Sequence, residues 1–493
     1  METVPLLADF VLLLTVAVAV TLLSHRVRIP SVVGLLLTGI VIGPSGLGLF
    51  RHSENVQSLA EIGVVALLFT TGLEFSLARL RLLRRFFFVG GSLQSIATIL
   101  VTYFVARAAG AEPRHAVFFG FLVALSSTAI VLKLLSDRRE LDTPHGRAAV
   151  GILLFQDFLV VPMIVLTPLL AGQVRASAGE MAIRFGGGLA VLGVAVLAAR
   201  FVMPRILALL ARTRVREIFI LGSLVLVLSM VLLTSSLGFS AALGAFLAGI
   251  LLAESEYSHQ LFADVVPFRD FFSSIFFISI GMLLQLSPVG SAWTRIAALA
   301  AIILLMKAAI VAVTVRVLRY PIRTALLTAI ALSQIGEFSF VLLTVPGAHA
   351  LLDPGAFQAF VGASVFTMMV TPLLIAWAPA LSTKLADIAP ATATGDASGM
   401  SGHVVAVGHG VSGHNLARVL REVRIPHVVV ELDPSRADEA KREGSRVIYG
   451  DATRMEILAM AGVERAAVAV FLISDAYALG RGIRFARQMN RSI

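Results

Sequence analysis

The sequence predicts an α-helical membrane protein that crosses the bilayer many times and ends in a small α/β domain. Of the 493 residues, 58% are hydrophobic and only 14% are charged, whereas soluble domains carry about 25% charged residues. Apolar runs recur as far as residue 381, and a run of about 20 residues crosses a hydrocarbon layer of roughly 30 Å. From residue 403 onward, short apolar strands alternate with amphipathic helices, which is typical of a doubly wound α/β fold.

The composition excludes several classes of protein. The chain has no cysteine, so disulfides, thiolate metal sites, iron–sulfur clusters and cysteine nucleophiles are ruled out. The net charge is +10, and it comes almost entirely from arginine. In a chain this apolar, we attribute the excess to the orientation of membrane loops, and we expect membrane lipid but no nucleic acid as a partner.

We expect about 13 transmembrane helices. If the N-terminus is outside, the cytoplasmic loops contain 17 arginines and the opposite loops contain six. This bias favours an odd number of spans, an outside N-terminus and a cytoplasmic C-terminal domain. The predicted spans cover residues 4–23, 30–48, 56–75, 87–107, 115–135, 148–170, 184–209, 216–236, 238–253, 267–286, 293–315, 322–345 and 356–380.

The chain is expected to consist of three parts. Residues 1–381 are expected to form the transmembrane domain. Residues 382–402 are small and polar, rich in Ala, Thr, Gly and Ser, and are expected to form a flexible linker. Residues 403–493 are expected to form a Rossmann-like domain, with strands near 404–407 and 427–431 among its elements.

A glycine-rich motif indicates that the Rossmann-like domain binds a nucleotide. Gly408, Gly410 and Gly413 follow the strand at 404–407 and open a helix over 412–422. The first glycine allows the tight turn, the second lets a pyrophosphate approach the backbone, and the third lets helix and strand pack closely. The helix N-terminus then offers unpaired N–H groups to phosphates. The alternative is a Rossmann-like domain with an empty site.

Acidic residues at the strand ends are candidates for binding the ribose. Glu431 ends the second strand, Asp433 is a less favoured substitute, and Asp451 follows the third strand. Such acids accept hydrogen bonds from ribose hydroxyls. No substrate domain follows the motif, so a regulatory sensor fits better than a dehydrogenase, and we expect no enzyme activity.

Ionisable side chains cost free energy in the membrane core, so those found there indicate an ion pathway. Asp157, preceded by Gln156, lies in the middle of the predicted span 148–170, and Lys307 lies in the middle of another. A lone carboxylate at this depth binds either a monovalent cation or a proton, because it does not stay charged and empty. Asp157 is the natural counter-charge for Lys307. A purely structural pairing of the two is the alternative.

Two predicted spans are interrupted by polar residues. Ser126, Ser127 and Thr128 interrupt span 115–135, and the segment 333–337, with Gln334 and Glu337, interrupts span 322–345. Unwound backbone at membrane depth is tolerated only where it lines a cavity or is buried, and it can present carbonyls to an ion. Helix packing explains the Ser/Thr run equally well. For Glu74, near an arginine-rich loop, a snorkelling or paired role is the simpler interpretation.

These features, in this order, resemble the monovalent cation:proton antiporters of the Kef type, the glutathione-regulated potassium-efflux systems. The tail is similar to the nucleotide-binding RCK or TrkA-N domains attached to potassium transporters and channels. The resemblance covers essentially the whole chain. The matching segments are LLFTTGLEFSLARLR (67–81), ALSSTAIVLKLL (124–135), LLFQDFLVVP (153–162), LLMKAAI (304–310) and SQIGEFSFVL (333–342).

The resemblance implies a fold and roles for these residues. It implies inverted repeats, two crossed discontinuous helices and a homodimer that works by an elevator-like motion. Asp157 would then bind the ion and the proton, and Lys307 would pair with it in the empty state. Glu337 would brace the crossed helices. The secondary ligands and supporting residues would be Gln156, Ser126, Ser127, Thr128, Gln334 and Glu74.

The resulting hypothesis is a potassium/proton antiporter of the bacterial inner membrane that couples K⁺ efflux to H⁺ entry. AMP or NAD(H) would regulate it through the cytoplasmic domain. A sodium/proton antiporter and a ligand-gated cation channel remain alternatives. Glutathione and an ancillary regulatory protein enter through the resemblance alone. The chain departs from its relatives at Ile335, where they commonly have glycine. We also expect the nucleotide domain to be incomplete, because relatives continue beyond the position of Ile493.

Overall fold

The structure is a computed structural model in which two compact units are described separately. The first comprises Met1–Ile130, Leu153–Leu304 and Gln334–Val370, and the second comprises Val131–Ile152, Leu305–Ser333 and Thr371–Ile493. Within these units the structure describes residues 3–27, 31–49, 54–73, 83–172, 178–237, 240–253, 255–282, 284–285, 293–388, 395, 397 and 399–493.

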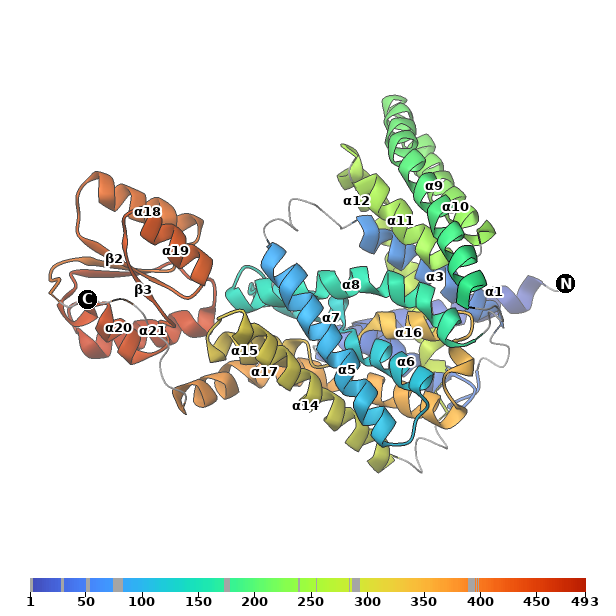
Figure 1. Cartoon of the computed structure of the whole chain (residues 1–493), viewed down its shortest axis with the longest axis horizontal. Helices are drawn as coiled ribbons and strands as arrows, with labels where there is room; N and C mark the ends of the chain where they lie inside the picture. The colour runs from blue at the N-terminus through green and yellow to red at the C-terminus, as the bar shows by residue number, and fades with distance from the viewer. Residues whose placement is uncertain are drawn as a thin grey trace. The chain divides into compact units, whose positions relative to one another are not determined.

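Helices are the regular secondary structure of the described residues of the membrane part (Figure 1). Its helices are α1 (Thr3–Val27), α2 (Ser31–Ile42), α3 (Glu54–Leu73), α5 (Ser92–Ala108), α6 (Pro113–Ala124), α7 (Thr128–Asp137), α8 (Pro144–Leu170), α9 (Ala178–Arg212), α10 (Arg216–Ser236), α11 (Ala241–Ala253), α12 (Ser258–Met282), α14 (Trp293–Val317), α15 (Ile322–Ala331), α16 (Glu337–Thr344) and α17 (Pro354–Ile388). A π-helix, Arg85–Gly91, precedes α5, and a short 3₁₀ helix, Ala348–Ala350, follows α16.

Several of these helices are suited to crossing a membrane. Among the described residues, seven helices are long and apolar enough to span it, by length and composition, and five further apolar helices are shorter. The membrane-protein fold class is therefore confirmed. The count of 13 spans stays a prediction.

Small residues allow the helices of the first unit to approach closely. Helix α3 packs against α11 where Gly72 faces Gly249. A Cβ atom added at Gly72 would lie 2.3 Å from the carbonyl oxygen of Phe246, and one at Gly249 would lie 2.2 Å from that of Phe69. Membrane helices gain their stability from such close packing, since lipid offers no hydrophobic driving force between them.

Two of the predicted spans are broken, as the sequence predicts. Helix α6 ends at Ala124 and α7 begins at Thr128, while α15 ends at Ala331 and α16 begins at Glu337. The two breaks contact each other: the N–H of Gly336 donates to the carbonyl oxygen of Leu125 at 3.1 Å. The hydroxyl of Ser339 donates to the carbonyl oxygen of Leu122 at 2.7 Å. Each break thus satisfies backbone groups that the other leaves unpaired.

The predicted linker is partly ordered. Helix α17 continues to Ile388, seven residues beyond the predicted boundary at residue 381. The reason is local, because the hydroxyls of Ser382 and Thr383 donate to the carbonyl oxygen of Pro379 at 3.1 and 2.6 Å. At the other end of the linker, Ala397 is fully buried and belongs to the core of the tail domain.

The tail is a four-stranded parallel sheet in the order β3-β2-β1-β4. Its strands are β1 (Val404–Val407), β2 (His427–Glu431), β3 (Arg446–Tyr449) and β4 (Val468–Phe471), and its helices are α18 (Val411–Glu422), α19 (Pro434–Arg442), α20 (Met455–Met460) and α21 (Ala476–Met489). These bounds agree with the predicted strands and helices to within about two residues, and they confirm the Rossmann-like prediction. The order reverses between β1 and β4, and ligands of such sheets bind at the carboxyl ends of the strands there.

Alternating side chains of the strands build a separate core on each face of the sheet. Val428 and Val430 belong to the core that includes residues of α20 and α21. Val429, between them, belongs to the core that includes residues of α18 and α19. Figure 1 shows these two helix pairs on opposite sides of the strands. Both faces are therefore covered, as continuous apolar strands require.

We predict that Gly336→Ala weakens the crossing of the two breaks. A Cβ atom at Gly336 would lie 2.5 Å from the carbonyl carbon and oxygen of Ser126, and overpacking of this kind costs about 1–3 kcal/mol. The thermal unfolding midpoint in detergent should fall. Gly193→Ala is the matched control, because nothing lies within 4 Å of its added Cβ. Equal behaviour of the two variants would contradict the prediction.

Candidate functional site

A buried carboxylate lies beside the first break. Asp157 is in the middle of α8 and is 2% exposed. The hydroxyl of Thr128, the first residue of α7, lies 3.0 and 3.2 Å from its two carboxylate oxygens. Thr128 reaches Asp157 because the chain has just left the extended stretch that follows α6. A carboxylate buried in this way requires a proton or a cation.

Gln156, the neighbour of Asp157, holds the extended segment in place. Its side-chain oxygen accepts a hydrogen bond of 2.8 Å from the backbone N–H of Ser126. Its amide nitrogen donates to the side-chain oxygen of Gln94 at 2.7 Å and lies 3.4 Å from the hydroxyl of Ser126. Ser127 is fully buried, and its hydroxyl accepts from the N–H of Ile130 at 3.2 Å. The five residues predicted to bind the ion are therefore neighbours in the structure: Asp157, Gln156, Ser126, Ser127 and Thr128.

Gln94 on α5 is a site residue that the sequence prediction missed. It is fully buried, and its amide nitrogen donates to Thr98 at 3.0 Å and to the carbonyl oxygen of Ala124, the last residue of α6, at 3.3 Å. The sequence contains a pattern that could have identified it. The polar residues Gln94, Ser95, Thr98 and Thr102, which the structure buries, recur on one face of α5. A polar face inside an apolar helix points to a partner within the protein.

Glu337 connects the two broken helices. It is the first residue of α16 and is 2% exposed. One of its carboxylate oxygens accepts a hydrogen bond of 3.1 Å from the N–H of Ala129, in the first turn of α7. The carboxylate therefore lies at the N-terminal, positively polarised ends of both helices. This arrangement fits the predicted bracing role.

The second break has a further anchor on α17. Gln334 is fully buried, and the N–H of Ile335 donates to the hydroxyl of Thr367 at 3.3 Å. Thr367 is also fully buried and was not predicted as a site residue. Ile335 occupies a position where glycine is expected, and its backbone is held here by a side chain of another helix.

The roles predicted for two further residues stay predictions. Lys307 is fully buried on α14 and belongs to the second unit. Its pairing with Asp157 stays a prediction. Glu74 lies outside the described residues.

The glycines of the tail motif have the expected conformations. Gly408 has φ = +99°, a value that side-chain-bearing residues rarely adopt. A Cβ atom at Gly413 would lie 1.9 Å from the carbonyl oxygen of Gly408, so a larger residue would push α18 away from the turn. Gly410 caps the N-terminus of α18 in an extended conformation. The motif therefore forms the tight strand-to-helix turn that, in dinucleotide-binding Rossmann folds, lies beside the bound phosphates.

Glu431 contacts the turn itself. One carboxylate oxygen accepts from the N–H of His409, and the other accepts from Leu432 and Asp433 at 2.7 and 2.8 Å. Burial raises the pKa of Glu431, although these backbone hydrogen bonds act in the opposite direction. The carboxylate predicted to bind ribose thus ties the glycine-rich turn to the end of β2.

Asp433 is linked to a membrane helix within the second unit. Its side chain caps α19 by accepting from the N–H of Ser435 at 2.9 Å, and it forms an ion pair with Arg147 near the start of α8. Tyr320 also donates to it at 3.4 Å. Burial alone would raise the pKa of Asp433, but Arg147 and Ser435 outweigh it and lower the pKa. Asp451 accepts from the N–H of Thr453 at 2.9 Å.

A second buried ion pair in this unit was also missed by the sequence prediction. Arg323, at the start of α15, donates to Asp475 at 2.7 Å, and their side chains are 4% and 11% exposed. Burial would raise the pKa of Asp475, but Arg323 and the hydrogen bond from Ala478 lower it. Tyr449 adds a hydrogen bond of 2.8 Å to the carbonyl oxygen of Arg319. The tail therefore contacts the ends of membrane helices at both edges of its sheet.

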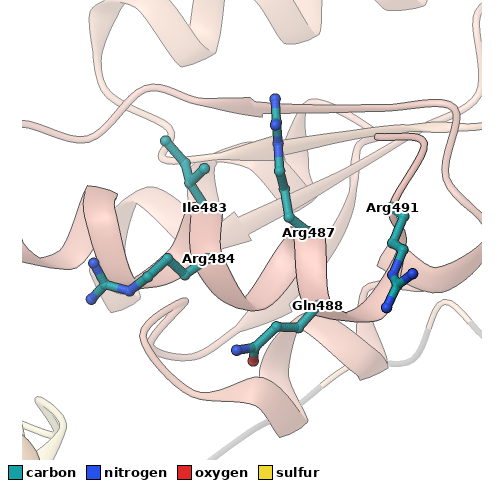
Figure 2. Close-up of a pocket in the computed structure, with 5 residues that line it drawn as sticks. All are labelled: Ile483, Arg484, Arg487, Gln488 and Arg491. Carbon is teal, nitrogen blue, oxygen red and sulfur yellow. The ribbon is translucent and has the colours of Figure 1, made fainter.

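A basic groove runs along α21. It has a volume of about 480 Å³ and is lined by Ile483, Arg484, Arg487, Gln488 and Arg491. Figure 2 shows that these side chains fan out in different directions and do not converge on one point. The groove contains none of the residues predicted to bind a nucleotide.

Comparison with known proteins shows the family. Residues 11–379 match the sodium/hydrogen exchanger transmembrane family, and residues 404–493 match the TrkA-N domain. The glutathione-regulated potassium-efflux system protein KefC from Salmonella schwarzengrund is 34% identical over 460 residues, which cover 92% of this chain and 73% of that protein. KefC from Escherichia coli O45:K1 is 34% identical over 457 residues with the same coverage.

A solved structure has the same fold. The sodium proton antiporter MjNhaP1 from Methanocaldococcus jannaschii matches with a TM-score of 0.57 and 17% sequence identity, over 78% of this chain and 99% of that chain. These matches agree with the two broken helices of the membrane part and with the parallel sheet of the tail. The chain is a transporter that belongs to the sodium/hydrogen exchanger family, as one of its Kef-type members with a C-terminal TrkA-N domain.

Proposed function

We propose that this chain exchanges potassium for protons at Asp157. The observation that carries the proposal is the position of this carboxylate, which is 2% exposed and contacts Thr128 at the break between α6 and α7. A single buried carboxylate holds one positive charge, either a proton or a monovalent cation. Because the two compete for the same oxygens, entry of one displaces the other, and this competition couples their movements.

The groups around Asp157 suit a partly dehydrated monovalent cation. Thr128 and Ser126 offer hydroxyl oxygens. The segment Leu125–Ser127 is non-helical, and unwound backbone of this kind can present carbonyl groups to an ion. Gln156 and Gln94 fix this segment by hydrogen bonds and need not contact the ion. We assign Gln156 and Gln94 to positioning, and Asp157, Ser126, Ser127 and Thr128 to ion binding.

Potassium is the preferred cation because the KefC relatives are named as potassium-efflux proteins. A sodium/proton antiporter is the alternative, since the distant structural relative is titled a sodium proton antiporter. Its identity of 17% supports the fold alone. A cation channel would conduct potassium without moving protons, so coupled flux separates that alternative.

Transport would proceed by elevator-type alternating access in a homodimer of the bacterial inner membrane. Lys307, fully buried on α14, would neutralise Asp157 when neither ion nor proton is bound, because a buried amine needs a counter-charge. The N-terminus would lie outside and the tail in the cytoplasm. Glutathione and an ancillary protein would act on the tail.

A nucleotide in the tail, AMP or NAD(H), would regulate exchange through Arg147. Arg147 and Asp157 are ten residues apart on α8, which corresponds to about 15 Å along the helix. Arg147 pairs with Asp433, which follows the end of β2 where a ribose is expected. A ribose that recruits Glu431 or Asp433 would alter this ion pair, and with it the attachment of α8 to the tail.

We predict that Asp157→Asn abolishes cation/proton exchange. Asparagine cannot take up a proton or balance the charge of a cation, so neither substrate is carried. Proton flux should be recorded in proteoliposomes after addition of potassium, sodium or rubidium. Asp137→Asn is the control, since Asp137 is exposed and, among the residues that the structure describes, pairs with Lys133 on the same helix. A folded Asp157→Asn variant that exchanges at the normal rate would refute the proposal, and faster flux with sodium would favour the alternative cation.

We predict that Arg323→Gln separates nucleotide binding from its effect on transport. The change breaks the buried pair with Asp475 but leaves the glycine-rich turn intact. AMP or NADH should still bind with wild-type affinity by calorimetry, yet it should no longer change the exchange rate in proteoliposomes. Arg323→Lys should restore part of the response. If Arg323→Gln responds to nucleotide as the wild type does, the attachment of the tail through Arg323 plays no part in regulation.

The Arg147–Asp433 pair gives a prediction for pH dependence. Because the pKa of Asp433 is lowered in the folded protein, the pair contributes fully at pH values above the ordinary aspartate pKa of 3.8. Its contribution is lost as the pH falls through the lower, folded-state value. Arg147→Gln should cost about 3–5 kcal/mol of stability at neutral pH.

The thermal unfolding midpoint of wild type and Arg147→Gln should therefore differ by a constant amount between pH 8 and pH 5, and the two should converge only in stronger acid. Arg216→Gln is the control, because the side chain of Arg216 in its pair with Asp264 is 74% exposed, and exposed pairs contribute about 0–1 kcal/mol. A difference that disappears near pH 6 would show that another group titrates.

A further inference from the structure

Three side chains outside the transport site converge in the tail. They are His409 in the glycine-rich turn, His414 in the first turn of α18, and Glu443, which directly follows α19. One ligand atom from each lies within 4.8 Å of the other two. The two histidines belong to one continuous turn and helix start, and the tertiary fold brings Glu443 to them.

The distances within this cluster match the spacing of ligands around a metal ion. Nδ1 of His414 lies 3.1 Å from Oε1 of Glu443, and Nε2 of His409 lies 3.6 Å from Oε2 of the same carboxylate. Tetrahedral zinc with ligands at about 2.0–2.2 Å places neighbouring ligand atoms about 3.3–3.6 Å apart. The distance from His409 falls at the upper end of this range, and the distance from His414 is slightly shorter than its lower end.

His409 lacks the hydrogen bonds that a buried histidine ordinarily makes. Its side chain is fully buried, yet neither ring nitrogen has a hydrogen-bond partner among the residues that the structure describes. The other two buried histidines of the tail differ. Nε2 of His403 lies 2.9 Å from the carbonyl oxygen of Ala461, and His427 contacts both Ile425 and Ser445. A buried polar group without a partner is costly, and a metal ion would supply the missing contact.

We propose that His409, His414 and Glu443 bind a divalent transition metal ion of the zinc class. Two imidazoles and one carboxylate are a donor set that zinc accepts, with a fourth position left for water. The chain has no cysteine, so no thiolate competes for such an ion. Bound metal would fasten the glycine-rich turn to α18 and to the end of α19, beside the nucleotide motif.

Arg421 contacts the Glu443 carboxylate, where its positive charge opposes the binding of a cation while its hydrogen bonds hold the carboxylate in place. Its guanidinium lies 3.4 and 3.5 Å from Oε2 of Glu443 and donates to the hydroxyl of Ser445 at 2.9 Å. The arginine charge lowers the affinity of this carboxylate for a cation. When a metal binds, Arg421 can keep Ser445 as its partner while Glu443 turns fully to the ion.

The test is a zinc titration of the full chain, purified in detergent without a histidine tag and stripped with EDTA. Calorimetry should give one zinc ion per chain, and His409→Gln and His414→Gln should each weaken binding at least about 100-fold, because each removes a ligand. His349→Gln is the control, since His349 is exposed and lies outside the tail, and it should leave the affinity unchanged. Arg421→Gln should bind zinc more tightly than the wild type.

Cobalt provides a second measurement that does not depend on transport. Co²⁺ in a site with two imidazoles should give visible absorption bands that are lost in His414→Gln, while the thermal unfolding midpoint of the metal-free variant stays that of the wild type. No zinc binding in the wild type would overturn the proposal. Equal zinc affinity in the wild type, His409→Gln and His414→Gln would overturn it as well, because the ion would then bind elsewhere.

Discussion

Burial of the Asp157 carboxylate is the constraint on which the membrane part depends. A group with one negative charge and 2% exposure needs polar partners, and intact helices in lipid have few to offer. The break at Leu125–Ser127 supplies Thr128, and the freed backbone requires partners in turn. Gln156 accepts from Ser126, and Gly336 of the second break donates to Leu125. The crossing, the glutamine pair and the bracing carboxylate of Glu337 thus follow from one buried charge.

In the second unit, two buried ion pairs connect membrane helices to the tail. Arg147 and Arg323 lie at the starts of α8 and α15 and form buried ion pairs with tail residues that follow β2 and β4. Buried pairs of this kind are costly to break and add little net stability. Their value lies in specificity, since they fix the tail to particular helices. One of these helices, α8, also carries Asp157, so the ion pair between Arg147 and Asp433 connects the end of β2 to the helix of the proposed transport site.

Much of this organisation could be predicted from local sequence, and the rest is non-local. The breaks were predictable because Ser126–Thr128 and Gly336-Glu337 interrupt apolar runs, and the tail because glycine spacing and strand patterns are local. Gln94 was missed because one buried glutamine resembles a tolerated polar residue until α6 and α8 are placed beside it. The partners of Arg147 and Arg323 lie 286 and 152 residues away, and arginines near helix ends are otherwise explained by membrane orientation.

Proton release on cation binding tests the central claim most directly, because it separates competition at Asp157 from the movement that follows. Potassium chloride is added to weakly buffered, detergent-solubilised protein, with choline chloride as the control for ionic strength, and the released protons are measured with a pH indicator. The account predicts that the wild type releases a proton for each potassium ion bound and that Asp157→Asn releases none. Equal proton release from the two proteins would contradict it.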